Sequence, residues 1–334
     1  MKLLNSFKKK CFEVNSATFD ALALELFQHQ AKSCQLYRKY INHLGIDVKE
    51  VTDISQIPCL PIDFFKHHEV QTGSWERWEY FLSSGTTSNS RSKHLIEDSI
   101  FYLNNSKLIF ERLFRPLNEN VFFALLPSYQ EQGNSSLVKM VDFFIKESGS
   151  VEAGGFYLNR QEELIHAIKK QLEVSNKSVI LFSVGYALLD LCQHVEDLEI
   201  KLDGLTIIET GGMKGRRKDM IKKEFYSILK NKLGEVIIHS EYGMTELLSQ
   251  AYSFNERTYK LPSQMKVLIR DPEDPFNYFS HNRVGGINVI DLANVHSCAF
   301  IETRDLGAIP AVGEFEILGR LDNSDIRGCN LMII

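Results

Sequence analysis

The sequence lacks any apolar run long enough to cross a membrane. The longest such run in the 334 residues, Ser178 to Cys192, falls short of a bilayer span and contains Asp190. The N-terminus, MKLLNSFKKKCFEV, is basic, but no apolar run with a small-residue cleavage site follows it, so we expect no signal peptide. These absences predict a soluble, cytoplasmic protein with no membrane span.

A strong charge imbalance is also missing. The 38 basic and 43 acidic residues are spread along the chain and give a net charge of -5, so no global field favours nucleic acid as a partner. Neither the Walker loop G-x-x-x-x-G-K-S/T nor the dinucleotide fingerprint G-x-G-x-x-G occurs. The six cysteines form no C-x-x-C pair and show no zinc spacing, so we expect reduced and mostly buried thiols. A specific small-molecule site is the expectation that remains.

The chain does contain enough apolar residues, 44% of the total, for a large core. Residues 1 to about 50 predict helices that end at Gly45, after which Pro58 and Pro61 force extended backbone. We expect one compact unit with three segments: a helical N-terminal region at 1–70 packed on the core, an α/β core at 71–260 and a β-rich region at 261–334.

A strand, a polar loop and a helix recur four times in the middle of the chain, beginning near Val121, Ser178, Leu202 and Leu233. Such alternation is typical of a mostly parallel sheet flanked by helices. Ligands bind such sheets beyond the carboxyl ends of the strands, where all four polar loops are expected to lie. From about Leu261 the short strands and turns predict an antiparallel or barrel-like region.

The segment FLSSGTTSNSRSKH is rich in hydroxyl groups around one glycine. Hydroxyls and glycine amides can approach phosphate oxygens closely, and Arg91 or Lys93 would supply the positive charge. A solvated loop explains the same composition, so the residues alone leave both interpretations open. The candidates for a phosphate cradle are Ser83, Ser84, Gly85, Thr86 and Thr87.

Two further loops carry chemistry-bearing residues. ETGGMKGRRKD places Gly211 and Gly212 after a strand, next to the basic side chain of Lys214, although a solvated loop at a helix start accounts for it equally well. SEYGMTELLSQ offers a ring to stack on a base, a glycine for close approach, a hydroxyl and a hard oxygen ligand for magnesium. These are Tyr242, Gly243, Thr245 and Glu246.

The order of the motifs is more informative than any one of them. A hydroxyl-glycine loop, a Gly-Gly loop, YGMTE, RDLG with Asp305 and finally GRLD follow one another from Phe81 to the C-terminus. This series resembles the adenylate-forming superfamily of acyl-CoA synthetases, adenylation domains and luciferases. The segments PSYQEQGNSSLVKMV, ETGGMKGR and GRLDNSDIRGCNLM resemble its acyl-protein synthetase (LuxE) family in particular. The resemblance implies the large-domain fold of adenylate-forming enzymes, with helix-flanked, mostly parallel sheets and a C-terminal barrel-like region.

The resemblance also implies roles for individual residues. The hydroxyl loop from Ser83 to Thr87 would grip the β- and γ-phosphates of ATP, with Arg91 at the position of a usual lysine. Tyr242 to Glu246 would contact adenine, phosphate and Mg²⁺, while Gly211 and Gly212 would line the adenine and acyl channel. Asp305 and Arg320 would bind the ribose.

We expect one part of the superfamily pattern to be missing. The resemblance implies a small domain after Asp322 that brings a catalytic lysine, whereas twelve residues follow Asp322 here. Lys214, Arg216 or a partner protein would have to replace that lysine. The family also transfers its acyl group to a cysteine near the C-terminus, which points to Cys329, although a buried structural cysteine is an equally good account.

These implications predict an ATP-dependent acid-thiol ligase. It would join a fatty or other carboxylic acid to AMP and pass the acyl group to a thiol, namely Cys329, coenzyme A, a carrier or a partner such as an acyl reductase. The alternative is a catalytically impaired protein of the same fold that binds nucleotide or acyl ligand and scaffolds a reductase or acyltransferase. An ATP-independent acyltransferase has little support, because no G-x-S-x-G motif occurs. The acid, the final acceptor and the oligomeric state stay open.

Overall fold

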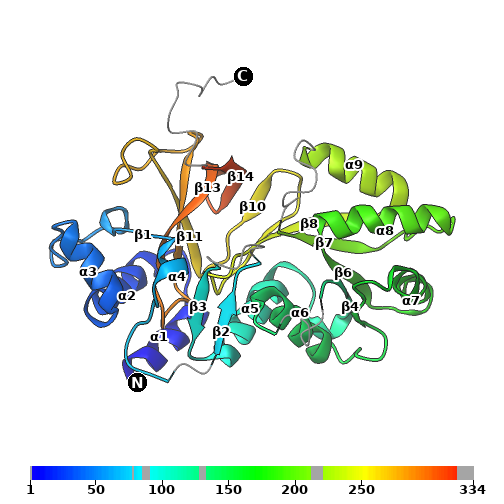
Figure 1. Cartoon of the computed structure of the whole chain (residues 1–334), viewed down its shortest axis with the longest axis horizontal. Coiled ribbons are helices and arrows are strands. Elements are labelled where there is room, and N and C mark those ends of the chain that lie inside the picture. The colour runs from blue at the N-terminus through cyan, green and yellow to red at the C-terminus, as the bar shows by residue number, and fades with distance from the viewer. Residues whose placement is uncertain (1, 77–78, 85–90, 128–132, 212–220, 322–334) are drawn as a thin grey trace. The chain divides into compact units, whose positions relative to one another are not determined.

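The protein comprises two compact units, each built from more than one stretch of the chain. The computed structural model describes residues 2–76, 79–84, 91–127, 133–211 and 221–321 (Figure 1). Unit 1 takes in Met1–Trp78, Ser92–Glu97 and Lys260–Ile334, and unit 2 takes in Glu79–Arg91 and Asp98–Tyr259.

Unit 2 holds most of the predicted α/β core. Its helices are α5 (Ser99–Leu113), η2 (Leu117–Glu119), α6 (Ser136–Glu147), α7 (Gln161–Val174), α8 (Gly185–Asp197) and α9 (Lys222–Leu233). Its strands are β2 (Glu79–Leu82), β4 (Asn120–Leu125), β5 (Gly155–Phe156), β6 (Ser178–Val184), β7 (Thr206–Thr210), β8 (Ile237–Tyr242) and β9 (Ala251–Ser253), and it includes the first two residues of β10 (Thr258–Lys260).

The strands of unit 2 form a sheet in the order β5-β4-β6-β7-β8-β9. Strands β4, β6, β7 and β8 are parallel, which confirms the prediction of a mostly parallel sheet. The expected helix after β8 is wrong. The chain instead turns over residues 243–250 and returns as β9, which pairs antiparallel with β8. The turn after Gly243 lets the chain pair with β8 at once, so the strand-loop-helix alternation stops there.

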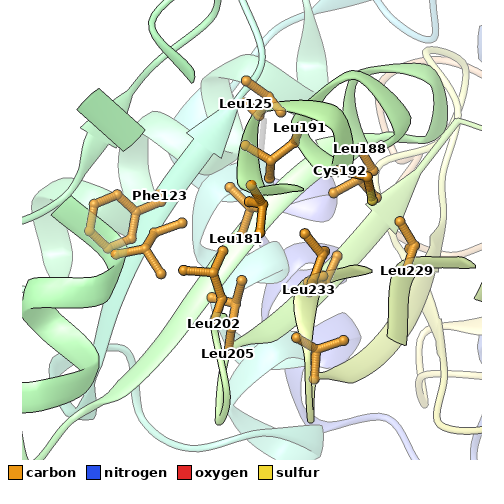
Figure 2. Close-up of a cluster of buried hydrophobic side chains, with 14 of the residues drawn as sticks. Phe123, Leu125, Leu181, Leu188, Leu191, Cys192, Leu202, Leu205, Leu229 and Leu233 are labelled. Atoms are coloured by element: carbon orange, nitrogen blue, oxygen red, sulfur yellow. The ribbon is translucent and has the colours of Figure 1, made fainter. Parts of the chain in front are cut away.

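Successive side chains of a strand point to opposite faces of a sheet, and both faces of this one are covered by helices. On one face, odd-numbered residues of β4 such as Phe123 and Leu125 belong to a buried hydrophobic cluster that also includes side chains of α7, α8 and α9 (Figure 2). On the other, Phe110 of α5 and Phe144 of α6 contact Phe122 of β4, with ring centroids 5.6 and 5.8 Å away. Full burial of β4 explains its continuous apolar sequence, VFFAL.

Unit 1 combines the N-terminal helices with the C-terminal strands. Its helices are α1 (Lys2–Glu13), α2 (Phe19–Ser33), α3 (Gln35–His43), η1 (Ile54–Gln56) and α4 (Phe64–His67). Its strands are β1 (Leu60–Pro61), β3 (Lys93–Ile96), β11 (Met265–Arg270), β12 (Gly285–Asp291), β13 (Phe300–Ala311) and β14 (Glu314–Arg320). The helical prediction for residues 1 to about 50 is confirmed, and Gly45 follows α3 with a left-handed φ of 69°.

The strands β11, β12, β13 and β14 of unit 1 pair antiparallel in chain order, as expected for the region after Leu261. Helix α2 is tied to this sheet through Gln30, whose side-chain Nε2 donates to Asn294 O at 2.8 Å and whose Oε1 accepts from Ala299 N at 2.9 Å. Gln30 sits on the buried face of α2 with Leu26 and Phe27. A polar residue can occupy this place because both ends of its amide are satisfied.

The structure also bears on the expectations about membrane spans and about cysteines. No helix in the described part of the chain is both long and apolar enough to cross a membrane. Five cysteines lie in the described part of the chain, where they form no disulfide with one another and are buried: Cys11, Cys34, Cys59, Cys192 and Cys298. Burial raises the pKa of Cys59 to about 12, so this thiol stays protonated and unreactive.

Candidate functional site

The candidate site in unit 2 lies at the carboxyl edge of β7 and β8. Thr210 ends β7 and is in register with Glu241, the residue before the end of β8. Exposed glycines follow at once, Gly211 with a left-handed φ of 79° and Gly243. Parallel strands therefore bring two of the predicted motifs to neighbouring positions at the edge where such sheets bind ligands.

Glu241 is a buried residue at this edge, on the same face of the sheet as Thr210. The residue is 8% exposed, and its Oε2 accepts a hydrogen bond from Thr210 Oγ1 at 2.5 Å. Burial raises the pKa of this carboxyl group to about 7; the Thr210 hydrogen bond opposes the rise and the Glu209 charge adds to it. The other carboxyl oxygen, Oε1, is 2.2 Å from where a Cβ on residue 243 would lie. A side chain at residue 243 would therefore displace the Glu241 carboxyl group from this position.

Glu209 and Ser240 lie on the opposite face of the same two strands. Ser240 Oγ donates to Glu209 Oε2 at 2.8 Å, and the Tyr226 hydroxyl of α9 is 2.5 Å from Ser240 Oγ. Because the Ser240 proton points to the carboxylate, the tyrosine is the donor in the second bond. This chain of hydrogen bonds fastens α9 to β7 and β8 just below the exposed glycines.

Tyr242 contributes its ring to the face that carries Glu209. The ring packs edge-on against Tyr259, with centroids 6.0 Å apart, and the residue is 7% exposed. Lys222 Nζ donates to the Tyr259 hydroxyl at 3.2 Å and lies 4.8 Å from the centre of that ring. Burial lowers the pKa of Lys222, while Glu209 and Glu256 oppose this effect. A flat ligand can reach little of the Tyr242 ring, so its use as a stacking platform stays a prediction.

Thr245 and Glu246 lie in the turn between β8 and β9. Thr245 is half-buried and Glu246 is 5% exposed. Their positions follow directly from the strand end, because only Gly243 and Met244 separate Thr245 from Tyr242. The motif YGMTE therefore occupies the carboxyl edge as one short segment.

The two ends of the hydroxyl-rich loop are joined in unit 2. Arg91 Nε donates to the carbonyl oxygen of Ser83 at 2.5 Å, and Leu82 N, at the end of β2, donates to Asn134 O at 2.8 Å. Ser84 and Arg91 are exposed. The Arg91 guanidinium group is thus held against the backbone of Ser83.

Unit 1 brings together the two residues that the family resemblance assigns to ribose. Asp305 on β13 and Arg320 on β14 are cross-strand partners, and Arg320 Nε is 3.3 Å from Asp305 Oδ1. The side chain of Asp305 is 13% exposed and that of Arg320 is 68% exposed. The aspartate is therefore held in place, whereas the arginine is accessible to a ligand.

Several predicted residues lie outside the described part of the chain. Their roles stay predictions: Gly85, Thr86 and Thr87 in the hydroxyl loop, Gly212, Lys214 and Arg216 after β7, and Asp322 and Cys329 near the C-terminus.

The sequence reasoning missed Glu209 and Glu241. Both are acidic residues that follow short apolar runs, in LTIIE and EVIIHSE, and that placement was the available signal. A carboxyl group at the carboxyl end of a buried parallel strand is costly unless it is hydrogen-bonded or neutral, so it marks a position with a specific purpose.

The residues present fit the expected cofactors. Mg²⁺ is usually held by one or two carboxylates together with the phosphates of its nucleotide, and Glu246 is a carboxylate on the edge segment. No group of three His, Cys, Asp or Glu suited to a metal occurs among the described residues. The exposed backbone of Gly211 and Gly243 is accessible to phosphate or base atoms.

A hollow of about 540 Å³ lies elsewhere in unit 2, at the amino-terminal end of β4. Its lining includes Val121, Ser150, Gln171 and Lys177. Lys177 Nζ donates to Ser148 O at 3.1 Å and to Ser150 Oγ at 2.9 Å. The hollow is on the edge of the sheet opposite to the motifs, and its lysine already caps the end of α6, so we assign it no role in the site.

The architecture is that of the adenylate-forming enzymes. A structure of 2-hydroxyisobutyryl-CoA ligase with 2-HIB-AMP and CoA matches with a TM-score of 0.65 at 12% identity, covering 92% of this chain and 69% of the ligase. ATP-bound MatB from Rhodopseudomonas palustris matches with a TM-score of 0.53 at 17% identity, covering 72% of this chain and 47% of MatB. Identities this low establish the fold alone, and they confirm the fold class predicted from the motif order.

Similarity to the LuxE family is found over the first third of the chain, whereas the segments quoted above for that resemblance lie after residue 104. Residues 8–104 match the family described as "Acyl-protein synthetase, LuxE". A long-chain-fatty-acid–luciferin-component ligase of Photorhabdus luminescens is 38% identical over 66 residues, which are 20% of this chain and 56% of the relative. This chain therefore spans little more than half of that relative's length and about half of MatB.

Proposed function

We propose that the protein is an acyl-activating ligase that uses ATP and Mg²⁺ to convert a fatty or other carboxylic acid into an acyl adenylate. The observation that carries the proposal is the position of YGMTE, which begins at the last residue of β8 and lies beside Gly211 in a sheet of the adenylate-forming fold. The LuxE match and the name of the Photorhabdus relative favour a long-chain fatty acid. The acyl group then passes to a thiol, of Cys329, coenzyme A, a carrier or a reductase partner.

The chemistry required of the site is positioning and charge neutralisation. A carboxylate oxygen attacks the α-phosphorus of ATP, the bond to the bridging oxygen breaks, and pyrophosphate leaves with that electron pair. Hydroxyl and amide donors at the carboxyl edge would hold the phosphates in line for this attack. Arg91 and Glu246 are the described charged groups assigned to the phosphates and to Mg²⁺. The thiol then displaces AMP from the acyl carbon.

The test is exchange of labelled pyrophosphate into ATP in the presence of carboxylic acids from acetate to palmitate. We expect exchange that depends on the acid and on Mg²⁺, with saturated acids of long chain as the best substrates. The assay needs only the first half-reaction, so it does not require the acyl acceptor. Absence of exchange with every acid, combined with tight ATP binding by calorimetry, would instead favour the impaired scaffold.

Asp305→Asn tests the ribose assignment in unit 1. We expect the KM for ATP to rise about tenfold with a smaller change in kcat, because a neutral amide accepts hydrogen bonds from two hydroxyls less well than a carboxylate does. Asp47→Asn, at an exposed aspartate of the same unit, is the matched control and should leave both constants as they are. Equal KM values for ATP in Asp305→Asn and the unaltered protein would show that Asp305 does not bind the ribose.

A further inference from the structure

Glu241 is a buried carboxyl group that the motif analysis leaves without a role. Among the described residues, no lysine, arginine or histidine forms an ion pair with it, and its hydrogen-bond donor is the Thr210 hydroxyl. Burying a carboxylate without a counter-charge costs several kcal/mol, so glutamine or a small apolar residue would be the cheaper choice for stability. The position therefore needs a reason beyond packing.

Three elements of unit 2 surround this carboxyl group. Thr210 on β7 and Tyr252 on β9 are its register partners in the sheet, so all three side chains lie on one face. Tyr102 of α5 covers the same face, and the Glu241 charge acts on both tyrosines. The Tyr252 hydroxyl is buried and has no hydrogen-bond partner in the part of the chain that the structure describes.

The Glu241 side chain folds back over the backbone of the YGMTE motif. Its Oε1 occupies the space where residue 243 would carry a Cβ, and its Oε2 is held by Thr210. The carboxyl group therefore connects the end of β7, where Gly211 begins one candidate loop, to Gly243, where the other begins. Loss of this connection leaves only the backbone pairing of β7 and β8 to hold the two strand ends in register.

We propose that Glu241 is a positioning residue for nucleotide binding, whose carboxyl group fastens the end of β7 to Tyr242 and Gly243 and fixes the backbone that meets the nucleotide. The inference rests on the proposed function, because it assigns the carboxyl edge to ATP. It adds a residue that does not itself contact the nucleotide and acts through Gly243.

The proton on Glu241 is part of this arrangement. Burial, together with the Glu209 charge, raises the pKa of Glu241 to about 7 against the Thr210 hydrogen bond. The Glu241 charge also acts on Tyr102 of α5, on Tyr252 of β9 and on Tyr259, which lies on the other face of the sheet. Burial raises the pKa values of all three tyrosines, so these hydroxyls stay neutral. An anionic nucleotide beside Glu241 favours its protonated form further. ATP binding above pH 7 should then take up a proton at this residue.

Calorimetry measures that proton directly. ATP and Mg²⁺ are titrated into the protein at pH 7.5 in two buffers of different ionisation enthalpy, and the difference in heat gives the protons taken up. We expect uptake about half a proton larger in the unaltered protein than in Glu241→Gln, since a group of pKa about 7 is mostly ionised at that pH. Glu224→Gln, at an exposed glutamate of α9, is the matched control and should behave as the unaltered protein.

The KM for ATP and the kcat of Glu241 variants distinguish a positioning role of Glu241 from a general effect on the structure. Glu241→Ala should raise the KM for ATP about tenfold, the value of one buried hydrogen bond, with a smaller effect on kcat. Glu241→Gln can still accept from Thr210 and should restore most of the affinity at pH 6. Thr210→Val should resemble Glu241→Ala, and the double variant should be no worse than either, because both remove the same connection.

The outcomes are distinguishable. Failure of the unaltered protein to bind ATP or to exchange pyrophosphate overturns the proposed function and this inference with it. Normal exchange, with the same proton uptake in Glu241→Gln and an unchanged KM in Thr210→Val, overturns the role of Glu241 alone. If Glu241→Ala does not fold, as judged by circular dichroism, the glutamine and valine variants carry the test.

Discussion

Glu241→Gln should stabilise the protein relative to the unaltered protein as the pH rises, and the difference in free energy of unfolding between the two should grow by about 2.5 kcal/mol from pH 5 to pH 8. The pKa of Glu241 rises from 4.5 to about 7 on folding. Between these two values the folded chain holds a proton that the unfolded chain has lost, so the free energy of unfolding falls as the pH rises, and it is flat above the folded pKa. A glutamine side chain is neutral at every pH in this range. The free energy of unfolding of Glu241→Gln therefore does not fall with rising pH on account of residue 241.

Urea unfolding at pH 5, 6, 7 and 8 measures the effect as the difference between the two proteins at each pH. Comparing variants removes the contribution of the other titrating groups, which are common to both. Glu224→Gln should run parallel to the unaltered protein, because that glutamate is exposed. A constant difference between Glu241→Gln and the unaltered protein over this range would mean that Glu241 is ionised in the folded protein.

The sequence predicted the parts of this molecule that depend on local pattern. The three N-terminal helices follow from apolar spacing that ends at Gly45, and the parallel strands β4, β6, β7 and β8 follow from short apolar runs that lead into polar loops. The expected helix after β8 failed because residues 243–250 carry enough apolar residues for a helix but turn back to pair with β8. Helix and strand patterns are hard to distinguish in such short segments.

In the candidate site, too, some residues could be recognised from the local sequence and others could not. YGMTE was found from its residues, since each carries recognisable chemistry at a fixed spacing. Glu241 was not, because its partner Thr210 is 31 residues earlier in the chain and comes beside it only through the register of β7 and β8. Asp305 and Arg320 were paired by resemblance to a family, and it is the hairpin of β13 and β14 that makes them cross-strand neighbours. Register is a property of the whole sheet, which single motifs do not report.

Glu246→Gln should lower the acid-dependent pyrophosphate exchange about a hundredfold or more, if Glu246 holds the Mg²⁺ of the nucleotide. The amide keeps the size of the buried side chain but removes the negative charge that a hard divalent cation requires. The loss should be larger at low Mg²⁺ and partly recovered at high Mg²⁺, because the remaining ligands of the metal are nucleotide oxygens. Chelation of Mg²⁺ should abolish exchange in every variant.

The dependence on Mg²⁺ is what separates a metal ligand from a structural carboxylate at this position. A structural role would lower exchange equally at all Mg²⁺ concentrations and would lower the midpoint of urea unfolding in the same variant. Glu256→Gln, in the exposed segment after β9, controls for the removal of one negative charge from the same unit. The same rate of exchange and the same apparent affinity for Mg²⁺ in Glu246→Gln and in this control would mean that Glu246 is not a ligand of the metal. The motif would then serve only to place Tyr242 and Gly243 at the end of β8.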